Sequence, residues 1–250
     1  MANSSEEKHE VFICFRGEDT RNTFTSHLNA AIRRVAIRTY IDHDLRRGEE
    51  IPQRLLKAIK DAKLSVIVFS ENFASSKWCL DEVVNILECK KRNNQIVVPV
   101  FYRVDPAVVR NQIGIYGEAF AKHEHRFEGE MNKVRKWREA LTEAANHSGW
   151  ECSLNKVECE VVEGIAKDVI EKLNHVYIGD LDEQIRKFEQ LAELQNQYYK
   201  AIPELEYLHI YQATVRRITE LKMKRSIRLL RLTPDMLPYV GNFKSDPDFD

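Results

Sequence analysis

Short apolar segments alternate with amphipathic helical segments along most of this 250-residue chain, and this alternation is what most constrains its fold. Residues 9–15 form an apolar, β-branched and aromatic run of strand length, and from Asn22 onward apolar residues recur every three or four positions, as on one helix face. Further strands are expected at 37–41, 65–69 and 96–101. Because parallel strands need crossovers, which are usually helical, the pattern predicts an α/β fold: a doubly wound parallel sheet with helices on both faces.

The last part of the chain has a different character. Residues 181–199 are rich in Gln and Glu, residues 204–230 contain a basic stretch, and both carry apolar residues at helical spacing. We therefore expect a C-terminal helical extension over 180–232. The basic stretch leaves two alternatives open: a helix that docks its apolar face and solvates its charges, or one that lies on a membrane surface or an acidic partner. We expect flexible ends at 1–7 and 233–250.

Composition argues against several classes of protein. Lys and Arg number 38 and Asp and Glu 39, so binding to nucleic acid or an anionic membrane would need a local patch. Neither an apolar run of about eighteen residues nor an export leader is evident, and the five cysteines lack CxxC spacing, so we expect reduced thiols in the cytosol or nucleus. The HExxH, GxGxxG and Walker A motifs are absent, so no metal site, Rossmann site or ATPase is predicted.

Three polar clusters follow predicted strands, at residues 16–21, 42–50 and 70–82. In open α/β sheets, ligands bind beyond the carboxyl ends of the strands, where connections diverge to opposite faces. Topology alone therefore predicts that these clusters converge on one cleft.

The third cluster opens a helix whose faces can be sorted by spacing. Its core stripe consists of Leu80, Val83, Val84 and Leu87. Cys79 and Glu82 stand one turn apart on a neighbouring face, which we expect at the rim of the cleft. A half-buried carboxylate beside an aromatic ring such as Trp78 can stabilise a positively charged, sugar-like transition state. Two plainer interpretations stay open: Glu82 as a first-turn acid favoured by the helix dipole, and Trp78 as a core residue.

The first cluster could bind phosphate. Arg16 and Arg21, with backbone N–H groups of the loop, can hold a pyrophosphate, because arginine binds phosphate oxygens with two parallel hydrogen bonds. An ordinary salt-bridged turn is the alternative. Gly17 and Gly48 give the first and second loops a residue able to adopt positive φ.

Five motifs together resemble the plant TIR (Toll/interleukin-1 receptor-like) domain family of disease-resistance proteins. They stand in family order at residues 11–21, 44–49, 75–82, 99–106 and 140–144. The resemblance implies a TIR domain over residues 8–175 with a flavodoxin-like sheet. Since residues 180–250 hold no Walker A loop, we expect a truncated TIR-plus-extension form without nucleotide-binding and leucine-rich-repeat domains.

The resemblance also implies an activity: an NAD⁺ nucleosidase that hydrolyses or cyclises NAD⁺ when TIR domains self-associate in plant innate immunity and cell death. Glu82 would be the catalytic residue, and NAD⁺ would be a substrate, with no cofactor expected. The residues expected to line the NAD⁺ site are Arg16, Gly17, Glu18, Asp19, Thr20, Arg21, Gly48 and Trp78. Some family members act as 2′,3′-cyclic nucleotide synthetases on nucleic acid and need the cysteine three residues before the glutamate, which makes Cys79 an auxiliary candidate.

Ser26 and His27 are adjacent, and neighbours on a helix do not face one another as a nucleophile and its base must. The residues alone therefore indicate a surface feature. The family resemblance implies instead that the pair belongs to a self-association interface. An alternative function follows: a non-catalytic adaptor or decoy that binds TIR-containing receptors through this surface.

Overall fold

A computed structural model describes residues 9–35, 37–41, 53–201 and 205–230. The chain divides into two compact units, Met1–Val169 and Ile170–Asp250, which are described separately below. The expected flexible ends and the loop at 42–50, which contains Gly48, lie outside the described residues.

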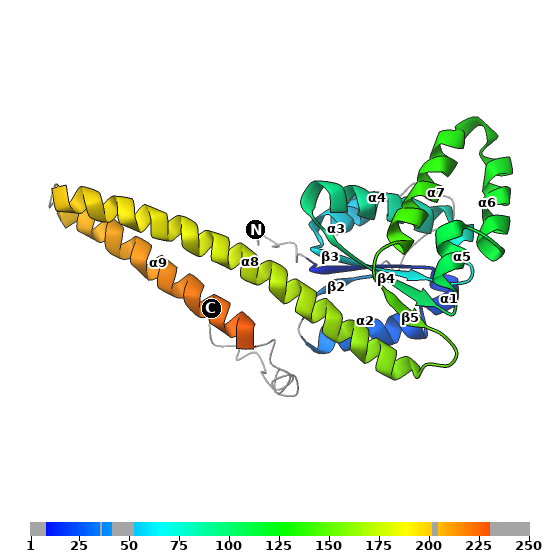
Figure 1. Cartoon of the computed structure of the whole chain (residues 1–250), viewed down its shortest axis with the longest axis horizontal. Helices are drawn as coiled ribbons and strands as arrows, with labels where there is room; N and C mark the ends of the chain where they lie inside the picture. Colours follow the sequence, from blue (N-terminus) through cyan, green and yellow to red (C-terminus); the bar gives the residue numbers. More distant parts are fainter. Residues whose placement is uncertain (1–8, 36, 42–52, 202–204, 231–250) are drawn as a thin grey trace, which may run out of the picture. The chain divides into compact units, whose positions relative to one another are not determined.

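A five-stranded parallel sheet in the order β2-β1-β3-β4-β5 forms the centre of the first unit (Figure 1). The strands are β1 (Val11–Phe15), β2 (Thr39–Tyr40), β3 (Leu64–Phe69), β4 (Ile96–Tyr102) and β5 (Trp150–Cys152). β1 pairs with β2 on one side and β3 on the other, so the connections diverge there. The predicted doubly wound α/β sheet is confirmed, and its switch point lies at β1 and β3.

Helices pack on both faces of the sheet, with α3, α4 and α7 on one face and α2 on the other (Figure 1). The helices of this unit are α1 (Gly17–Thr20), α2 (Phe24–Arg34), α3 (Gln53–Asp61), α4 (Lys77–Asn93), α5 (Pro106–Asn111), α6 (Ile115–Arg126), α7 (Met131–Ala145) and the start of α8 (Glu158–Ala201), with 3₁₀ turns η1 (Phe73–Ser75) and η2 (Glu128–Glu130). β1 and β3 are buried at every residue, which explains why all their residues except Ser65 are apolar.

The sequence pattern did not predict two short elements, β5 and α5. β5 has three residues, one of them the exposed Glu151, so it is too short to show a period. α5 spans six residues, yet it carries a start signal: the Asp105 side chain accepts a hydrogen bond from the Ala107 N–H at 2.7 Å, and Pro106 follows this cap.

The predicted boundary between the TIR domain and the helical extension is not a break in the chain's helical structure, because α8 continues across it. We expected the TIR domain to end at residue 175 and the helical extension to begin at 180, but α8 runs without interruption from Glu158 to Ala201. Gly179 lies inside it, and a helical glycine costs only about 1 kcal/mol, which neighbouring turns can offset. The second unit is thus the later part of α8 and α9 (Leu205–Leu230), a helical extension as expected.

Gly149 is required by close approach to β4. A Cβ built there would stand 2.4 Å from the carbonyl oxygen of Pro99 and 2.6 Å from its Cγ. We expect Gly149→Ala to lower the free energy of unfolding by about 2 kcal/mol or more, because a β-strand backbone must shift. Urea denaturation measures this. At Gly129 an added Cβ would meet nothing within 4 Å. Gly129→Ala is therefore the matched control, and equal losses for both variants would contradict the interpretation.

Candidate functional site

Asp19 ties together the loops that follow β1 and β3. Its Oδ2 accepts hydrogen bonds from the Ser70 hydroxyl at 2.6 Å and the Asn72 backbone N–H at 2.9 Å, and its Oδ1 accepts from the Asn72 side-chain amide at 3.1 Å. Tyr116 donates to the Ser70 carbonyl at 2.9 Å and supports the same loop. The predicted convergence of the first and third clusters is confirmed, whereas the second cluster lies outside the described residues.

Glu82 lies deeper than its spacing indicates. Its side chain is 3% exposed, so the expected half-buried position at the rim is wrong. The alternative as a first-turn acid is also wrong, because α4 begins at Lys77 and has no acidic residue in its first turn. The face of α4 that carries Glu82 is turned toward β1. There the Glu82 carboxylate lies close enough to Cys14 to raise the pKa of its thiol.

Two buried thiols line the surroundings of Glu82. Burial, and then the charge of Glu82, raises the pKa of Cys79 to about 12, and the same causes in the same order raise the pKa of Cys14 well above its usual value. The Cys79 thiol donates to the carbonyl oxygen of Phe15 at 3.6 Å. Since the thiolate is the nucleophilic form, Cys79 is present here as a neutral donor rather than as an activated nucleophile.

Arg16 supplies a donor beside this cluster. Its Nη2 donates to the Glu18 carboxylate at 2.6 Å, and its positive charge acts to lower the pKa of Cys79, which places the guanidinium near that thiol. Its Nε is buried and finds no hydrogen-bond partner among the described residues. A buried donor without a partner costs about 1–3 kcal/mol, so a bound group that accepts this hydrogen bond would be stabilised.

Other residues of the first loop have structural contacts. Thr20 is 1% exposed and its hydroxyl accepts from Thr25 at 2.8 Å, so it belongs to the core. The Arg21 guanidinium lies over the Phe15 ring at 5.1 Å, and a Cβ on Gly17 would come within 2.8 Å of Arg21 Nη2. Of the predicted NAD⁺-lining residues in this loop, Arg16 and Asp19 are the two whose charges act on the pKa of Cys79.

Trp78 stands one helical turn before Glu82 on α4, whereas Ser26 and His27 lie on α2. Trp78 is half-buried, with the Lys77 ammonium 5.4 Å from its ring centroid. Ser26 donates to the Thr23 carbonyl at 2.7 Å, and the exposed His27 has its Nδ1 3.6 Å from a Glu158 carboxylate oxygen. The pair is therefore on the helix surface, as its spacing predicts.

Cys14, Ser70 and Asn72 are not among the predicted site residues. Cys14 lies in β1, and Ser70 and Asn72 follow β3. Proximity to the carboxyl ends of the two strands at the switch point is the signal that could have identified them.

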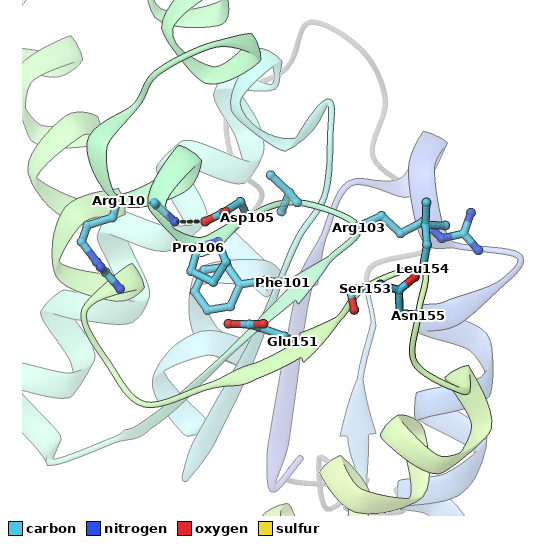
Figure 2. A pocket seen from close by; sticks show the side chains of 11 residues that line it. Phe101, Arg103, Asp105, Pro106, Arg110, Glu151, Ser153, Leu154 and Asn155 are labelled. Atoms are coloured by element: carbon cyan, nitrogen blue, oxygen red, sulfur yellow. Dashed lines mark hydrogen bonds between the residues drawn. The ribbon is translucent and has the colours of Figure 1, made fainter.

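A separate pocket of about 660 Å³ lies at the carboxyl ends of β4 and β5 (Figure 2). Phe101 and Pro106 lie at its centre, with Glu151 close to them and Arg110 and Arg103 to either side. Its four charged lining residues, Arg103, Asp105, Arg110 and Glu151, are all exposed. This pocket includes none of the predicted site residues. Exposed charges such as these interact only weakly with a bound ligand, because water screens them, so we place the candidate chemistry at Glu82.

The described residues offer no candidate for metal binding or for crossing a membrane. No group of three or more His, Cys, Asp or Glu side chains there is arranged to hold a metal ion. No described helix combines the length and the apolar character that a membrane crossing requires.

Comparisons with known proteins agree on one family. The family described as TIR domain matches residues 8–188. Disease resistance protein RPV1 of Vitis rotundifolia is 50% identical over 165 residues, 66% of this chain and 12% of that protein. TMV resistance protein N of Nicotiana glutinosa is 40% identical over 200 residues, 77% of this chain and 18% of that protein. The chain thus spans less than a fifth of either relative.

A solved structure is also similar. The TIR domains in the structure of the activated Roq1 resistosome directly recognizing the pathogen effector XopQ are 46% identical, with a TM-score of 0.59. The match covers 64% of this chain and 99% of that one.

The three hydrogen bonds that Asp19 accepts from Ser70 and Asn72, which we call the Asp19 bracket, predict a specific loss of stability. Asp19→Ala removes the acceptor of three hydrogen bonds and leaves the Ser70 hydroxyl unpaired. We expect the free energy of unfolding to fall by about 2–3 kcal/mol. Chemical denaturation measures it against Glu18→Ala, a neighbouring exposed carboxylate whose loss should cost about 0.5 kcal/mol at most. A small effect at Asp19 would mean that the two loops are not held by this residue.

The raised pKa of Cys79 predicts slow alkylation. With a pKa of about 12, only on the order of 10⁻⁴ of the thiol is ionised at pH 8, and the side chain is buried. We expect iodoacetamide to modify the exposed Cys159 at least ~100-fold faster than Cys79, measured by peptide mass spectrometry. Unfolding in urea should equalise the two rates. Equal rates in the native protein would restore Cys79 as an accessible nucleophile.

Proposed function

The chain belongs to the TIR domain family, and we propose that it is an NAD⁺ nucleosidase in which Glu82 is the catalytic carboxylate. The observation that carries this proposal is that the buried Glu82 and Arg16, the residue that follows β1, both act on Cys79, and that the buried Nε of Arg16 has no hydrogen-bond partner among the described residues. A carboxylate in the core and a buried donor of this kind are costly for stability, and such groups concentrate at functional sites.

The chemistry suits a buried carboxylate. When the bond between nicotinamide and ribose breaks, its electron pair leaves with the nicotinamide nitrogen and positive charge develops on the ribose. A carboxylate fixed in a low-dielectric site stabilises that charge more strongly than one in water. Water, or a hydroxyl of the substrate, then attacks the ribose carbon and releases a proton, which yields ADP-ribose or a cyclic product.

The first loop would hold the rest of the substrate. Arg16 can donate its Nε hydrogen bond to a phosphate oxygen, because a guanidinium suits phosphate geometry. Trp78, half-buried on α4 one helical turn before Glu82, would offer a ring face to the substrate. Gly48 keeps its predicted role but lies outside the described residues.

We extend the proposal to the biological setting. The relatives RPV1 and N are resistance proteins, and the similar TIR domains come from an assembled resistosome. On this basis we propose that the chain signals in plant innate immunity, in the cytosol or nucleus, and that self-association through the exposed Ser26 and His27 surface switches it on.

An adaptor without catalysis is the second candidate. The observation that favours it is that Ser26 and His27 are exposed on α2, whereas Glu82 is buried on α4. Binding to another TIR domain through this surface would not require chemistry at Glu82. Cyclic nucleotide synthesis on nucleic acid receives less support, because Cys79 is buried and protonated.

Nicotinamide release from NAD⁺ tests the proposal directly. We expect wild type to release nicotinamide at a rate that rises steeply with protein concentration in a crowding agent. Glu82→Gln keeps the side-chain shape but removes the charge and should lower the rate at least ~100-fold. Glu88→Gln, at an exposed site on the same helix, should leave the rate unchanged. Equal turnover by wild type and Glu82→Gln would exclude this mechanism, and binding to TIR partners without turnover would favour the adaptor.

A further inference from the structure

The hairpin of the second unit has one apolar seam facing inward and another facing outward. Along α8, Ile185 and Ala192 stand seven residues apart and are 8% and 9% exposed, and Leu221 of α9 is 1% exposed. A second series of residues with seven-residue spacing includes the positions just before Ile185 and Ala192 and forms the outward-facing seam. It consists of Tyr177, Gln184, Leu191 and Tyr198.

The far end of this outer seam is exposed. Leu191, Leu194 and Tyr198 are 42%, 55% and 64% exposed, at spacings of three and four residues. Large apolar side chains at this spacing on a helix usually pack against another element. The described part of the unit supplies only one neighbour for each helix, so those residues leave this seam uncovered.

The near end of the seam is a groove. A hollow of about 360 Å³ lies between α8 and α9, with an apolar lining from Tyr177, Leu181 and Ile227. Its polar lining residues are Asp180, Gln184, Lys224 and Arg228. Since Tyr177 and Gln184 open onto this groove, Leu191 and Tyr198 follow on the same side of α8 at seven-residue steps.

Cross-helix contacts fix the register of the hairpin. Lys222 pairs with Glu189 at 2.7 Å, and Arg225 pairs with Asp182 further toward the start of α8. Arg228 then lies over the Tyr177 ring at 4.1 Å. The helices are therefore antiparallel, and the groove beside Ile227 and the exposed Tyr198 lie at opposite ends of the seam.

We propose that this face binds a second copy of the chain, with the two hairpins antiparallel, to form a four-helix bundle. In that arrangement Tyr198 of each copy enters the groove beside Tyr177 and Ile227 of the other, and Leu191 lies opposite Gln184. The contact is isologous, because a two-fold axis at the middle of the seam converts each half of the interface into the other. The antiparallel bundle also has the packing geometry that heptad spacing favours.

The seam itself identifies a second copy as the occupant. The exposed Leu191 and Tyr198 and the groove lie on the same side of α8, so a second copy offers each of them its counterpart, and one docking event creates its twin and doubles the buried area. The two-fold axis passes near Lys187, whose ammonium is paired with Glu183 at 2.6 Å, so the interface does not bring two uncompensated charges together. From Tyr177 to Tyr198 the seam is roughly 30 Å long, at about 1.5 Å per residue.

Sedimentation equilibrium of the full chain tests the interface. We expect Leu191→Glu combined with Tyr198→Glu to weaken dimerisation at least ~10-fold, with far-UV circular dichroism unchanged because both side chains are exposed. Val215→Glu is the matched control: Val215 is 38% exposed on α9, twelve residues before Ile227 and so about 120° around the helix. Identical association of all three proteins would overturn the proposal.

Disulfide trapping separates this contact from any association of the TIR domains. In a Cys159→Ser background, Tyr198→Cys combined with Ile227→Cys should give a covalent dimer on mild oxidation. Tyr198→Cys alone should not, because the antiparallel arrangement keeps the two positions roughly 30 Å apart. A dimer from the single variant, or none from the double variant, would contradict it. Glu82→Gln should leave trapping unchanged, so this result is independent of the proposed catalysis.

Discussion

The parallel pairing of β1 with β3 is the constraint on which the candidate site depends. Its register places Phe15 opposite Val68, so both strands end at one edge of the sheet and their loops meet. Asp19 can then reach Ser70 and Asn72 across the switch point. A slip of one residue would turn every side chain of β1 to the other face and would separate this bracket. Because both strands are buried on both faces, such a slip is strongly disfavoured.

Burial gives the cluster around Glu82 its electrostatic character. The same low-dielectric surroundings that keep Cys14 and Cys79 protonated would strengthen the interaction of Glu82 with a developing positive charge. A site of this kind reduces stability, since a buried carboxylate and a buried Arg16 Nε that has no partner in the described part of the chain are both unfavourable in a folded protein. The surrounding core and the Asp19 bracket offset that cost, so we view the loops as rigid supports for the proposed chemistry.

The two units divide the proposed work between them. The sheet unit holds Glu82 and the loop proposed to bind phosphate, whereas the helical hairpin holds the outer seam proposed to bind a second copy. A hairpin has too few layers to enclose an apolar core by itself, and self-association is a physical remedy for that shortage. Since the proposed cleavage depends on assembly, the hairpin would raise the local concentration of one TIR domain near another.

The sequence by itself determined the order of strands and helices, the parallel sheet and the convergence of the first and third polar clusters, because apolar periodicity and crossover rules are local or topological. It did not reveal β5 or α5, which are shorter than any detectable period, nor the continuity of α8 through Gly179. Tertiary structure alone decided that Glu82 is buried. A helical period identifies the face of α4 that is apolar, but only packing against β1 decides that the neighbouring face is covered as well.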